Sequence, residues 1–217
     1  KSIVEPIMKS GFDGIFIAIS NPVDIIAHYI YKLSGLPKNQ VIGTGTAIDS
    51  ARLQNMIAQT VNVDPRSVHA YSMGEHGDSQ MVPWSTVTIA GKPFYDVIAD
   101  NKELVGDVDL DELVYRTTQE GWEIFNRKGT TYYGIATACV GVIKAILNDE
   151  NRIIPVSTLL EGEYGERNVY AGVPTVLNRS GAYDVLEIHM TPGELARFKE
   201  STRVIREYTD RIMKLNL

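Results

Sequence analysis

One apolar run near the start of the chain constrains the fold more than any other feature. Residues 14–19 read Gly-Ile-Phe-Ile-Ala-Ile, and the turn residues Ser20, Asn21 and Pro22 follow directly. A continuous apolar run between turn residues predicts a strand that is buried on both faces, as in a parallel sheet. The run therefore favours the α/β class of folds.

The pattern on either side of this strand supports that class at first and then changes. Helices are predicted over residues 2–10, 23–32, 46–60, 111–126 and 132–147. Further strands are predicted over residues 41–42, 68–71, 86–89, 153–159, 173–177 and 183–187, the last three in a meander. A long final helix opens at Thr191-Pro192-Gly193-Glu194, with threonine as the N-cap. The first 60 residues are thus α/β, and the remainder is a mixed α+β part that begins near residues 43–46.

Two stretches of the second part carry expectations of their own. Helix 132–147 is nearly all apolar, so we expect it to be buried. Residues 101–112 are rich in acidic side chains and are expected to form a solvated loop and a helix start, where the helix dipole favours carboxylates.

The composition is that of a globular chain and argues against a nucleic-acid-binding, membrane-surface or membrane-spanning protein. Hydrophobic residues make up 44% of the 217 residues and charged residues 22%, which is typical of a globular chain. The 21 Lys and Arg against 27 Asp and Glu give a net charge of −6, so neither nucleic acid nor an anionic membrane surface is an expected partner. The apolar runs 15–19 and 135–143 fall well short of the roughly 18 residues that span a membrane.

The single cysteine, Cys139, excludes an internal disulfide and a four-cysteine metal site. We expect it to be a small core residue in a protein of the reducing cytoplasm. The four histidines are scattered and show no metal-ligand spacing, so no metal is expected. The chain also lacks Gly-x-Gly-x-x-Gly, a phosphate loop and a His-Glu-x-x-His helix.

Three dispersed groups could nevertheless carry chemistry. Asn21 follows the buried strand, at the edge of the sheet where ligands of open α/β folds bind, or it simply forms an Asn-Pro turn with a candidate cis bond. Asp49 and Arg52 are three residues apart on a predicted helix, so they share a face. That face could present a surface ion pair, or it could line a cleft where Arg52 would bind a carboxylate.

The third group is His76, in the block Gly74-Glu75-His76-Gly77-Asp78-Ser79. A lone histidine is commonly structural or solvated, whereas a histidine held by a carboxylate is a tuned acid–base group. Asp49 could be that carboxylate, although spacing alone does not establish the pairing. These residues provide candidate groups without selecting a reaction.

The order of the motifs selects one family. Ser20-Asn-Pro-Val-Asp24, Val41-Ile-Gly-Thr-Gly-Thr46, Asp49-Ser-Ala-Arg52 and the His76 block resemble the L-lactate/malate dehydrogenase family. Val82-Pro-Trp-Ser85, Lys128-Gly-Thr-Thr-Tyr-Tyr-Gly134 and Tyr164-Gly-Glu-Arg167 through Gly172-Val-Pro174 continue the resemblance to the end of the chain. Each motif is weak alone, but seven in order are specific. The resemblance implies the C-terminal part of a doubly wound (Rossmann) parallel-sheet domain over residues 1–43 and an α+β substrate domain over residues 44–217.

The resemblance also implies roles for particular residues. The family transfers hydride between NADH and a 2-oxo acid, so His76 would be the acid–base group and Asp49 its orienting carboxylate. Arg52 would bind the substrate carboxylate, Asn21 the reacting oxygen, and Thr131 would line the substrate side-chain pocket. The nicotinamide end of NAD would lie against Ile19, Ser20, Asn21, Thr44 and Ile135.

Details within the family favour L-lactate as the substrate. Glu75 stands where typical malate enzymes carry glycine, and Trp84-Ser85 and Asn178-Arg179 are lactate-like. The same features resemble 2-hydroxyisocaproate dehydrogenases, so that activity and malate dehydrogenase remain alternatives. His69 matches a histidine that binds fructose 1,6-bisphosphate in activated bacterial enzymes, but Gln54 replaces the arginine of that site. We therefore expect a weak or absent response to that sugar phosphate.

One part of the family pattern has no counterpart in these residues. Roughly a hundred family residues that precede this region, with the Gly-x-Gly-x-x-Gly turn and a mobile loop that carries an arginine, are expected to be absent. A truncated chain that only packs or oligomerises is accordingly the alternative from another functional class. Family members are commonly assembled from identical subunits, so a homodimer or homotetramer is expected.

Overall fold

The computed structural model describes residues 1–216, apart from the side chains of Leu104, Leu215 and Asn216. The helices are α1 Val4–Lys9, α2 Val23–Ser34, α3 Ala47–Val61, α4 Phe94–Asp100, α5 Lys102–Val105, α6 Leu110–Lys128, α7 Tyr133–Leu147 and α8 Pro192–Asn216. The strands are β1 Phe16–Ala18, β2 Val41–Gly43, β3 Val68–His69, β4 Thr88–Ile89, β5 Lys92–Pro93, β6 Arg152–Glu161, β7 Arg167–Asn178 and β8 Gly181–Val185. Short 3-10 turns lie at Lys38–Gln40, Pro65–Ser67, Trp84–Thr86 and Glu163–Gly165.

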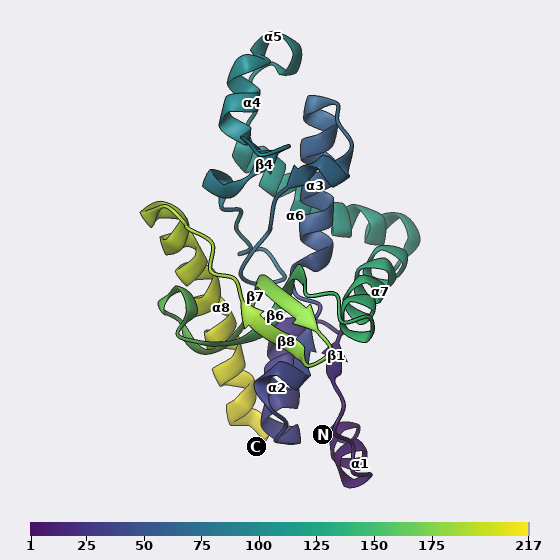
Figure 1. The fold of residues 1–217 in the computed structure, drawn as a ribbon. Helices are drawn as coiled ribbons and strands as arrows, with labels where there is room; N and C mark the ends of the chain where they lie inside the picture. The colour runs from purple at the N-terminus through teal and green to yellow at the C-terminus, as the bar shows by residue number, and fades with distance from the viewer. Residues whose placement is uncertain (217) are drawn as a thin grey trace.

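A five-stranded mixed sheet in the order β1-β2-β6-β7-β8 organises the lower half of the molecule (Figure 1). Strands β1 and β2 are parallel, while β2–β6, β6–β7 and β7–β8 are antiparallel. The predicted α/β class and the meander at residues 153–187 are therefore confirmed. The junction between the two strand sets is at Gly43, which pairs with Ser157 of β6. One sheet thus contains strands from both sides of residue 43.

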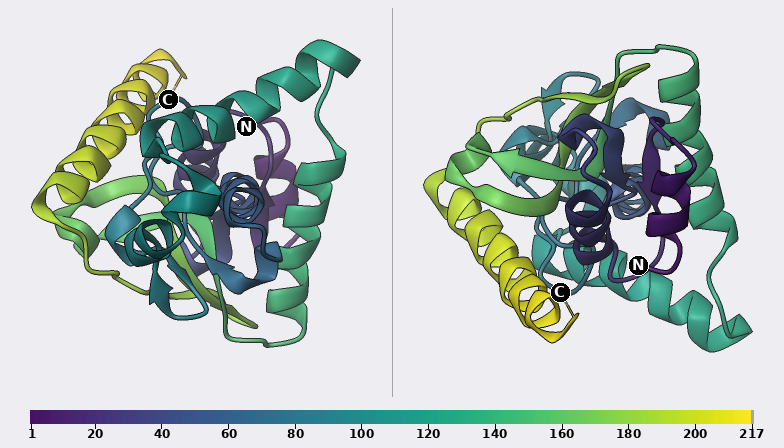
Figure 2. Two further views of the ribbon diagram at one scale, coloured as in Figure 1. Left: turned by 90° about the horizontal axis from the view of Figure 1, so that it is seen from above. Right: turned by 90° about the horizontal axis from the view of Figure 1, so that it is seen from below.

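Helices pack against this sheet from different sides. Helix α2 contacts β2, β6, β7 and α8, whereas α7 contacts β7 and α3. Helices α8 and α7 lie on opposite sides of the molecule in Figures 1 and 2. One apolar cluster includes Ile25 of α2, Leu160 of β6 and Phe198 of α8, all of which are buried. A second cluster packs Val142 and Ile146 of α7 against the sheet.

A smaller layer forms the upper half of the molecule in Figure 1. The short strands β3, β4 and β5 make a second sheet beside α3 and α4, and α6 packs against α3. Its core contains the buried side chains of Leu53, Ile57, Trp84, Phe94 and Leu113. The predicted strand at residues 68–71 is shorter than expected, because only Val68 and His69 pair with β4.

Helix α7 is less buried than its composition predicts. Only Val142, Ala145 and Ile146 are buried, whereas Tyr133 is 72% exposed and Leu147 is 71% exposed. The expectation of a buried helix is wrong because one face alone reaches the sheet. Cys139 is half-buried rather than a core residue, and its partial burial raises the pKa of the thiol.

Strand β1 is also less covered than expected for a strand buried on both faces. Phe16 and Ile17 are half-buried, Ala18 is buried, and Ile19 beyond the strand is 53% exposed. The reason is its position at the end of the strand order, where β2 is its neighbour within the described residues.

Two predicted helix starts, those of α8 and α6, are confirmed by side-chain caps. Thr191 and Glu194 form a reciprocal pair at the start of α8, in which the Thr191 N–H donates to the Glu194 carboxylate at 2.8 Å and the Glu194 N–H donates to Thr191 Oγ1 at 3.3 Å. In the acidic stretch 101–112, the Asp109 side chain accepts from the N–H groups of Asp111 and Glu112 and so caps α6. The same stretch contains the one-turn helix α5, which the sequence pattern did not predict.

Candidate functional site

The principal pocket lies at the carboxyl ends of the parallel strands β1 and β2. Its volume is about 680 Å³. It is lined by residues from the turn after β1, from α3, α6 and α7, and from three loops: Ile19, Asn21, Thr44, Ile48, Asp49, Arg52, Glu75, His76, Gly77, Asp78, Gln80, Thr118, Gly121, Trp122, Phe125, Thr130, Thr131 and Ile135. Most residues singled out from the sequence therefore meet in one cavity at the sheet edge where open α/β folds bind ligands.

A histidine–carboxylate pair forms one wall of this pocket. Nδ1 of His76 lies 2.6 Å from Oδ2 of Asp49, and with Asp49 as a carboxylate, which can only accept, the Nδ1–H is the donor. The Asp49 side chain is 3% exposed and the His76 side chain 20% exposed. Nδ1 is thus engaged inside the protein, and Nε2 is the ring nitrogen left for a pocket ligand.

The environment of His76 favours its charged form. Burial alone would lower its pKa, but the Asp49 hydrogen bond and charge, together with the charge of Asp24, raise the pKa above its ordinary value. Arg52 opposes this effect without reversing it. The result is a histidine that holds its proton more firmly than an isolated imidazole and can release it to a neighbouring oxygen.

Arg52 lies on the same face of α3 as Asp49, one helical turn later. Its Nη1 is 3.4 Å from Asp49 Oδ1, and its side chain is only 12% exposed. The pair is therefore part of a cleft wall rather than a surface ion pair. On the opposite side the guanidinium approaches Gly121 of α6, where an added Cβ would lie 3.2 Å from Nη1. A planar guanidinium held in this way is suited to binding a carboxylate through two parallel hydrogen bonds.

Asn21 enters the pocket from the turn after β1. The Asn21–Pro22 bond is cis, as the sequence suggested, and α2 begins at the next residue. Asp24, in the first turn of α2, accepts a hydrogen bond from the backbone N–H of His76 at 3.0 Å. Burial raises the pKa of Asp24 to about 6, and the Ser157 hydroxyl and then the hydrogen bond from His76 oppose this shift. Asp24 was not among the candidate residues from the sequence, because no local pattern relates it to a residue 52 positions away.

The residues assigned to the nicotinamide end divide into two groups. Ile19, Thr44 and Ile135 line the pocket together with Asn21, and Thr44 is fixed by a 2.9 Å hydrogen bond from its backbone N–H to the Ala18 carbonyl. Ser20 is exposed in the turn and is not among the lining residues.

Helix α6 supplies a wall that the sequence analysis did not identify. Thr118, Gly121, Trp122 and Phe125 recur at helical spacing along one face and line the pocket. Beneath them, Gln80 Nε2 donates to Thr118 Oγ1 at 3.0 Å. The helical spacing of these four positions indicates a shared face in the sequence. That this face lines a pocket follows only from the packing of α6 against α3.

The two positions considered for sugar-phosphate binding lie outside the pocket. His69 is exposed on β3. The side-chain amide of Gln54 donates to the carbonyl oxygen of Ala70 at 3.0 Å, and the amide carries no charge. The neutral side chain of Gln54 is therefore already hydrogen-bonded to Ala70, the residue that follows His69.

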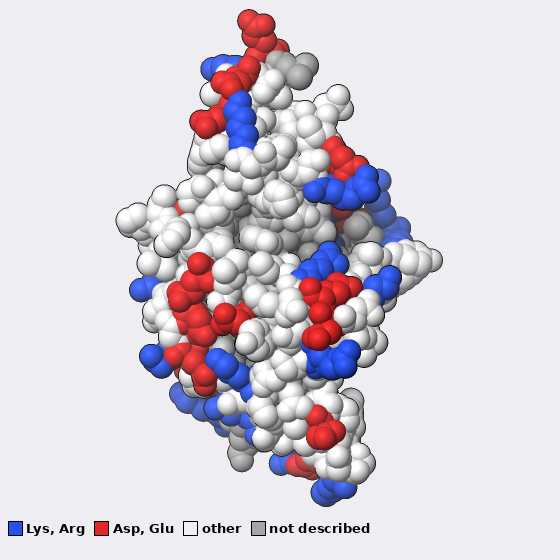
Figure 3. All heavy atoms as spheres, in the orientation of Figure 1, with Lys and Arg blue, Asp and Glu red and all other residues white. Residues whose placement is uncertain are grey.

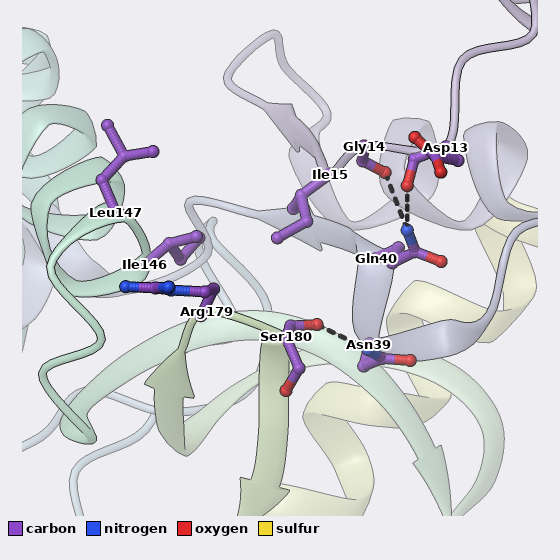
Figure 4. A pocket seen from close by; sticks show the side chains of 9 residues that line it. All are labelled: Asp13, Gly14, Ile15, Asn39, Gln40, Ile146, Leu147, Arg179 and Ser180. Atoms are coloured by element: carbon purple, nitrogen blue, oxygen red, sulfur yellow. Dashed lines mark hydrogen bonds between the residues drawn. The ribbon is translucent and has the colours of Figure 1, made fainter.

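A second cavity of about 500 Å³ lies near the opposite end of β1 (Figure 4). Its polar side chains hold backbone segments together. Gln40 donates to the carbonyl oxygens of Asp13 and Gly14, and Asn39 donates to the carbonyl oxygen of Ser180. Because these amides are already used, and no acid–base pair is among its lining residues, this cavity offers less chemistry than the principal pocket.

The surface and the donor groups add two observations on the described residues. On the face seen in Figure 3, acidic and basic side chains are interspersed around a largely uncharged centre. In the part of the chain that the structure describes, no three His, Cys, Asp or Glu side chains are grouped to hold a metal ion. Within the same residues, no helix is long and apolar enough to cross a membrane.

Fold and pocket together define the class of protein. It is a mixed α/β protein with a polar pocket at the carboxyl ends of parallel strands, where a carboxylate-paired histidine stands beside a partly buried arginine. Comparison with known families narrows the class: residues 46–215 match the alpha/beta C-terminal domain of lactate/malate dehydrogenase, and residues 1–43 match its NAD binding domain. The chain belongs to the lactate/malate dehydrogenase family.

Individual relatives agree with this assignment. L-lactate dehydrogenase 3 of Bacillus thuringiensis subsp. konkukian is 51% identical over 96% of the chain, and L-lactate dehydrogenase 1 of Bifidobacterium longum subsp. longum is 46% identical over 97%. The chain spans 66% and 67% of the length of these curated relatives. The crystal structure of minor L-lactate dehydrogenase from Enterococcus mundtii in the ligands-bound form superposes with a TM-score of 0.93 at 42% identity, covering 97% of the chain and 67% of that structure.

Proposed function

We propose that the protein is an NAD-dependent L-lactate dehydrogenase that interconverts pyruvate and L-lactate. The observation that carries this proposal is the 2.6 Å pairing of His76 with Asp49 beside Arg52 within one pocket. An acid–base group next to a carboxylate-binding cation fits a small acid whose carbonyl group lies adjacent to its carboxylate. The names of the relatives support the same substrate class.

The pocket residues divide the work of pyruvate reduction. Arg52 binds the substrate carboxylate and thereby fixes the position of the neighbouring carbonyl carbon. Asn21 donates a hydrogen bond to the carbonyl oxygen, and protonated His76 gives its Nε2 proton to that oxygen as the carbon is reduced. Asp49 keeps Nδ1 protonated and stabilises the imidazolium form, which is required before the reaction. In lactate oxidation the same histidine, now neutral, removes the hydroxyl proton.

The residues present fit the nicotinamide end of NAD. Ile19 and Ile135 provide apolar surface at the strand-end side of the pocket, and Thr44 lies beside them. NADH, when bound, supplies the hydride for pyruvate reduction. The apolar residues exclude water from the reacting face, and Thr131 borders the space for the substrate side chain.

The substrate preference is tested with a panel. Purified protein expressed from its natural gene is assayed for NADH oxidation with pyruvate, oxaloacetate and 2-oxoisocaproate. We expect the highest kcat/KM with pyruvate. A higher kcat/KM with either other acid would transfer the assignment to malate or 2-hydroxyisocaproate dehydrogenase. Silence of the protein with all three acids would contradict the proposal. The 217-residue chain assayed alone distinguishes a catalytic unit from a fragment that only packs.

Domain organisation, assembly, regulation and location form the rest of the proposal. Residues 1–43 are assigned to the NAD-binding domain and residues 44–217 to the substrate domain. We expect a homodimer or homotetramer, which light scattering of the eluted protein measures, and a cytoplasmic location, which cell fractionation measures. Because Gln54 carries no charge, fructose 1,6-bisphosphate should leave the half-saturating pyruvate concentration nearly unchanged, and a large fall in that concentration would contradict this expectation.

A further inference from the structure

Asp24 connects two segments that both contribute to the pocket. It lies in the first turn of α2, three residues after Asn21, and it is 3% exposed. Its Oδ2 accepts the backbone N–H of His76 at 3.0 Å, across 52 positions of sequence. This hydrogen bond is therefore a direct link between the Asn21 turn and the loop that carries His76.

The surroundings of Asp24 make this link sensitive to charge. Its other oxygen, Oδ1, is buried beside the buried Oγ of Ser157, and neither atom has a partner among the described residues at hydrogen-bond geometry, although the Ser157 hydroxyl is near enough to lower the pKa of Asp24. A buried carboxylate is costly unless an opposite charge compensates it. The charged neighbours that face it are His76 and Glu75, and of these only the imidazolium of His76 is attractive. The charged forms of Asp24 and His76 therefore stabilise each other.

We propose that Asp24 is a positioning residue that fixes His76 relative to Asn21 and favours the protonated form of His76. The kinetic part of this inference rests on the proposed function, in which both side chains meet the same carbonyl oxygen. Displacing the side chain of either His76 or Asn21 lowers the rate of proton transfer without weakening NADH binding. Asp24 acts from outside the pocket, since it is not among the lining residues.

Two substitutions separate position from charge. Asp24→Asn keeps an oxygen for the His76 N–H but removes the charge, whereas Asp24→Glu keeps the charge on a side chain that is one methylene longer. Glu166→Gln is the matched control, because Glu166 is a buried carboxylate that accepts from Arg206 Nη2 at 2.7 Å and does not line the pocket. Thermal unfolding of all three variants verifies that they are folded.

The first readout does not require catalysis. Of the two protonation forms of imidazole, diethylpyrocarbonate modifies only the neutral one. The pH dependence of His76 modification, followed by peptide mass spectrometry, therefore reports the titration midpoint of His76. In Asp24→Asn we expect this midpoint and the pH profile of pyruvate reduction to fall by about 0.5–1 pH unit. In Asp24→Glu we expect a midpoint near wild type, with kcat reduced about 10- to 100-fold and the KM for NADH unchanged.

Specific results would overturn the proposal. A wild-type His76 midpoint in Asp24→Asn would remove the electrostatic role, and a wild-type kcat in Asp24→Glu would remove the positioning role. An equal kcat loss in Glu166→Gln would show that both effects are structural. If the wild-type protein does not reduce pyruvate, the proposed function fails, while the modification midpoint still decides whether Asp24 supports the charge of His76.

Discussion

The chemistry proposed for the pocket depends on a few individual side chains, and His76 is central among them. Asp49 is hydrogen-bonded to Nδ1 of its imidazole ring, and Asp24 accepts a hydrogen bond from its backbone N–H. The two carboxylates act on the same residue in different ways, since one fixes the ring and the other fixes the main chain. A substitution at His76 therefore tests the proposed reaction most directly.

We predict that His76→Asn abolishes turnover and leaves NADH binding intact. Loss of a general acid lowers rates by about 10²–10⁴-fold, and asparagine retains a polar side chain at this position. Stopped-flow turnover and NADH fluorescence titration measure the two quantities, with the exposed His189→Asn as the control. Because the pKa of His76 is raised, pyruvate reduction should decline only as pH rises through that raised value, and lactate oxidation should increase over the same range. Retained turnover in His76→Asn would contradict the assignment.

His28 presents a different case, in which burial disfavours charge. It is 4% exposed in α2, neither ring nitrogen has a partner among the described residues, and burial lowers its pKa to about 4. Above pH 6.5 the ring is neutral in both folded and unfolded chains. As pH falls from 6.5 to about 4 the unfolded chain binds the proton first, so folding stability is lost in that window.

We predict that His28→Leu reduces the loss of stability between pH 7 and pH 4.5 by an amount on the order of 2 kcal/mol. Urea unfolding at the two pH values measures the free energy of unfolding. His189→Leu is the matched control, because His189 is exposed. If both variants lose as much stability as the wild type on acidification, burial of His28 is not the cause.

At the scale of elements, α6 forms one wall of the pocket and faces the Arg52 guanidinium at a glycine. Gly121 stands where the Arg52 guanidinium comes closest to the helix, 3.2 Å from a hypothetical Cβ. Glycine in a helix is ordinarily unfavourable by about 1 kcal/mol relative to alanine. Its presence at this position gives the guanidinium the space it occupies.

We predict that Gly121→Ala raises the KM for pyruvate about tenfold while thermal stability is kept or increased. The displaced guanidinium loses one of its two hydrogen bonds to the substrate carboxylate, and alanine favours the helix. Gly141→Ala in α7 is the control, since its added Cβ meets no atom of the described residues within 4 Å. It should gain stability with no change in KM. An unchanged KM in Gly121→Ala would show that Arg52 does not depend on this space.

The sequence pattern predicts elements better than it predicts their surroundings. The cap residues Thr191 and Glu194 locate the start of α8 because capping is local chemistry. The apolar composition of α7 cannot indicate which face finds a partner, so its exposure was not foreseen. The Asp24–His76 link joins positions 52 residues apart and leaves no local signature. Asp49 and Arg52 were recognisable as a pair only because they share one turn of a helix.

At the scale of the whole molecule, the main sheet joins residues on both sides of position 43. Gly43 pairs with Ser157, and the Tyr170 hydroxyl donates to the Val41 carbonyl oxygen at 3.2 Å. Gly45 permits the close approach: its φ is 51°, and an added Cβ would lie 2.3 Å from the Ser157 nitrogen. The two parts assigned to cofactor and substrate are therefore continuous in hydrogen bonding.

We predict a single cooperative unfolding transition, with a calorimetric enthalpy equal to the van't Hoff enthalpy. Gly45→Ala should lower the Tm of that whole transition. Gly35→Ala is the matched control, because Gly35 has a similar positive φ of 68° but an added Cβ has no neighbour within 4 Å in the part of the chain that the structure describes. The excess destabilisation of Gly45→Ala thus measures the close packing of the segment after β2 against β6. Two resolved transitions in the wild-type protein would contradict the coupling.

The single turn of α3 between Asp49 and Arg52 has a consequence for how such a protein diversifies. Three residues of helix rise about 4.5 Å, and no side-chain change elsewhere alters that interval. The residue that holds the proposed acid–base histidine and the residue proposed to bind the substrate carboxylate are thus kept at a fixed separation by one helix. New substrates would be gained by substitutions in the pocket wall that faces α3, from Thr118 to Phe125 and in the loop at Thr131. The spacing of Asp49 and Arg52 would stay unchanged.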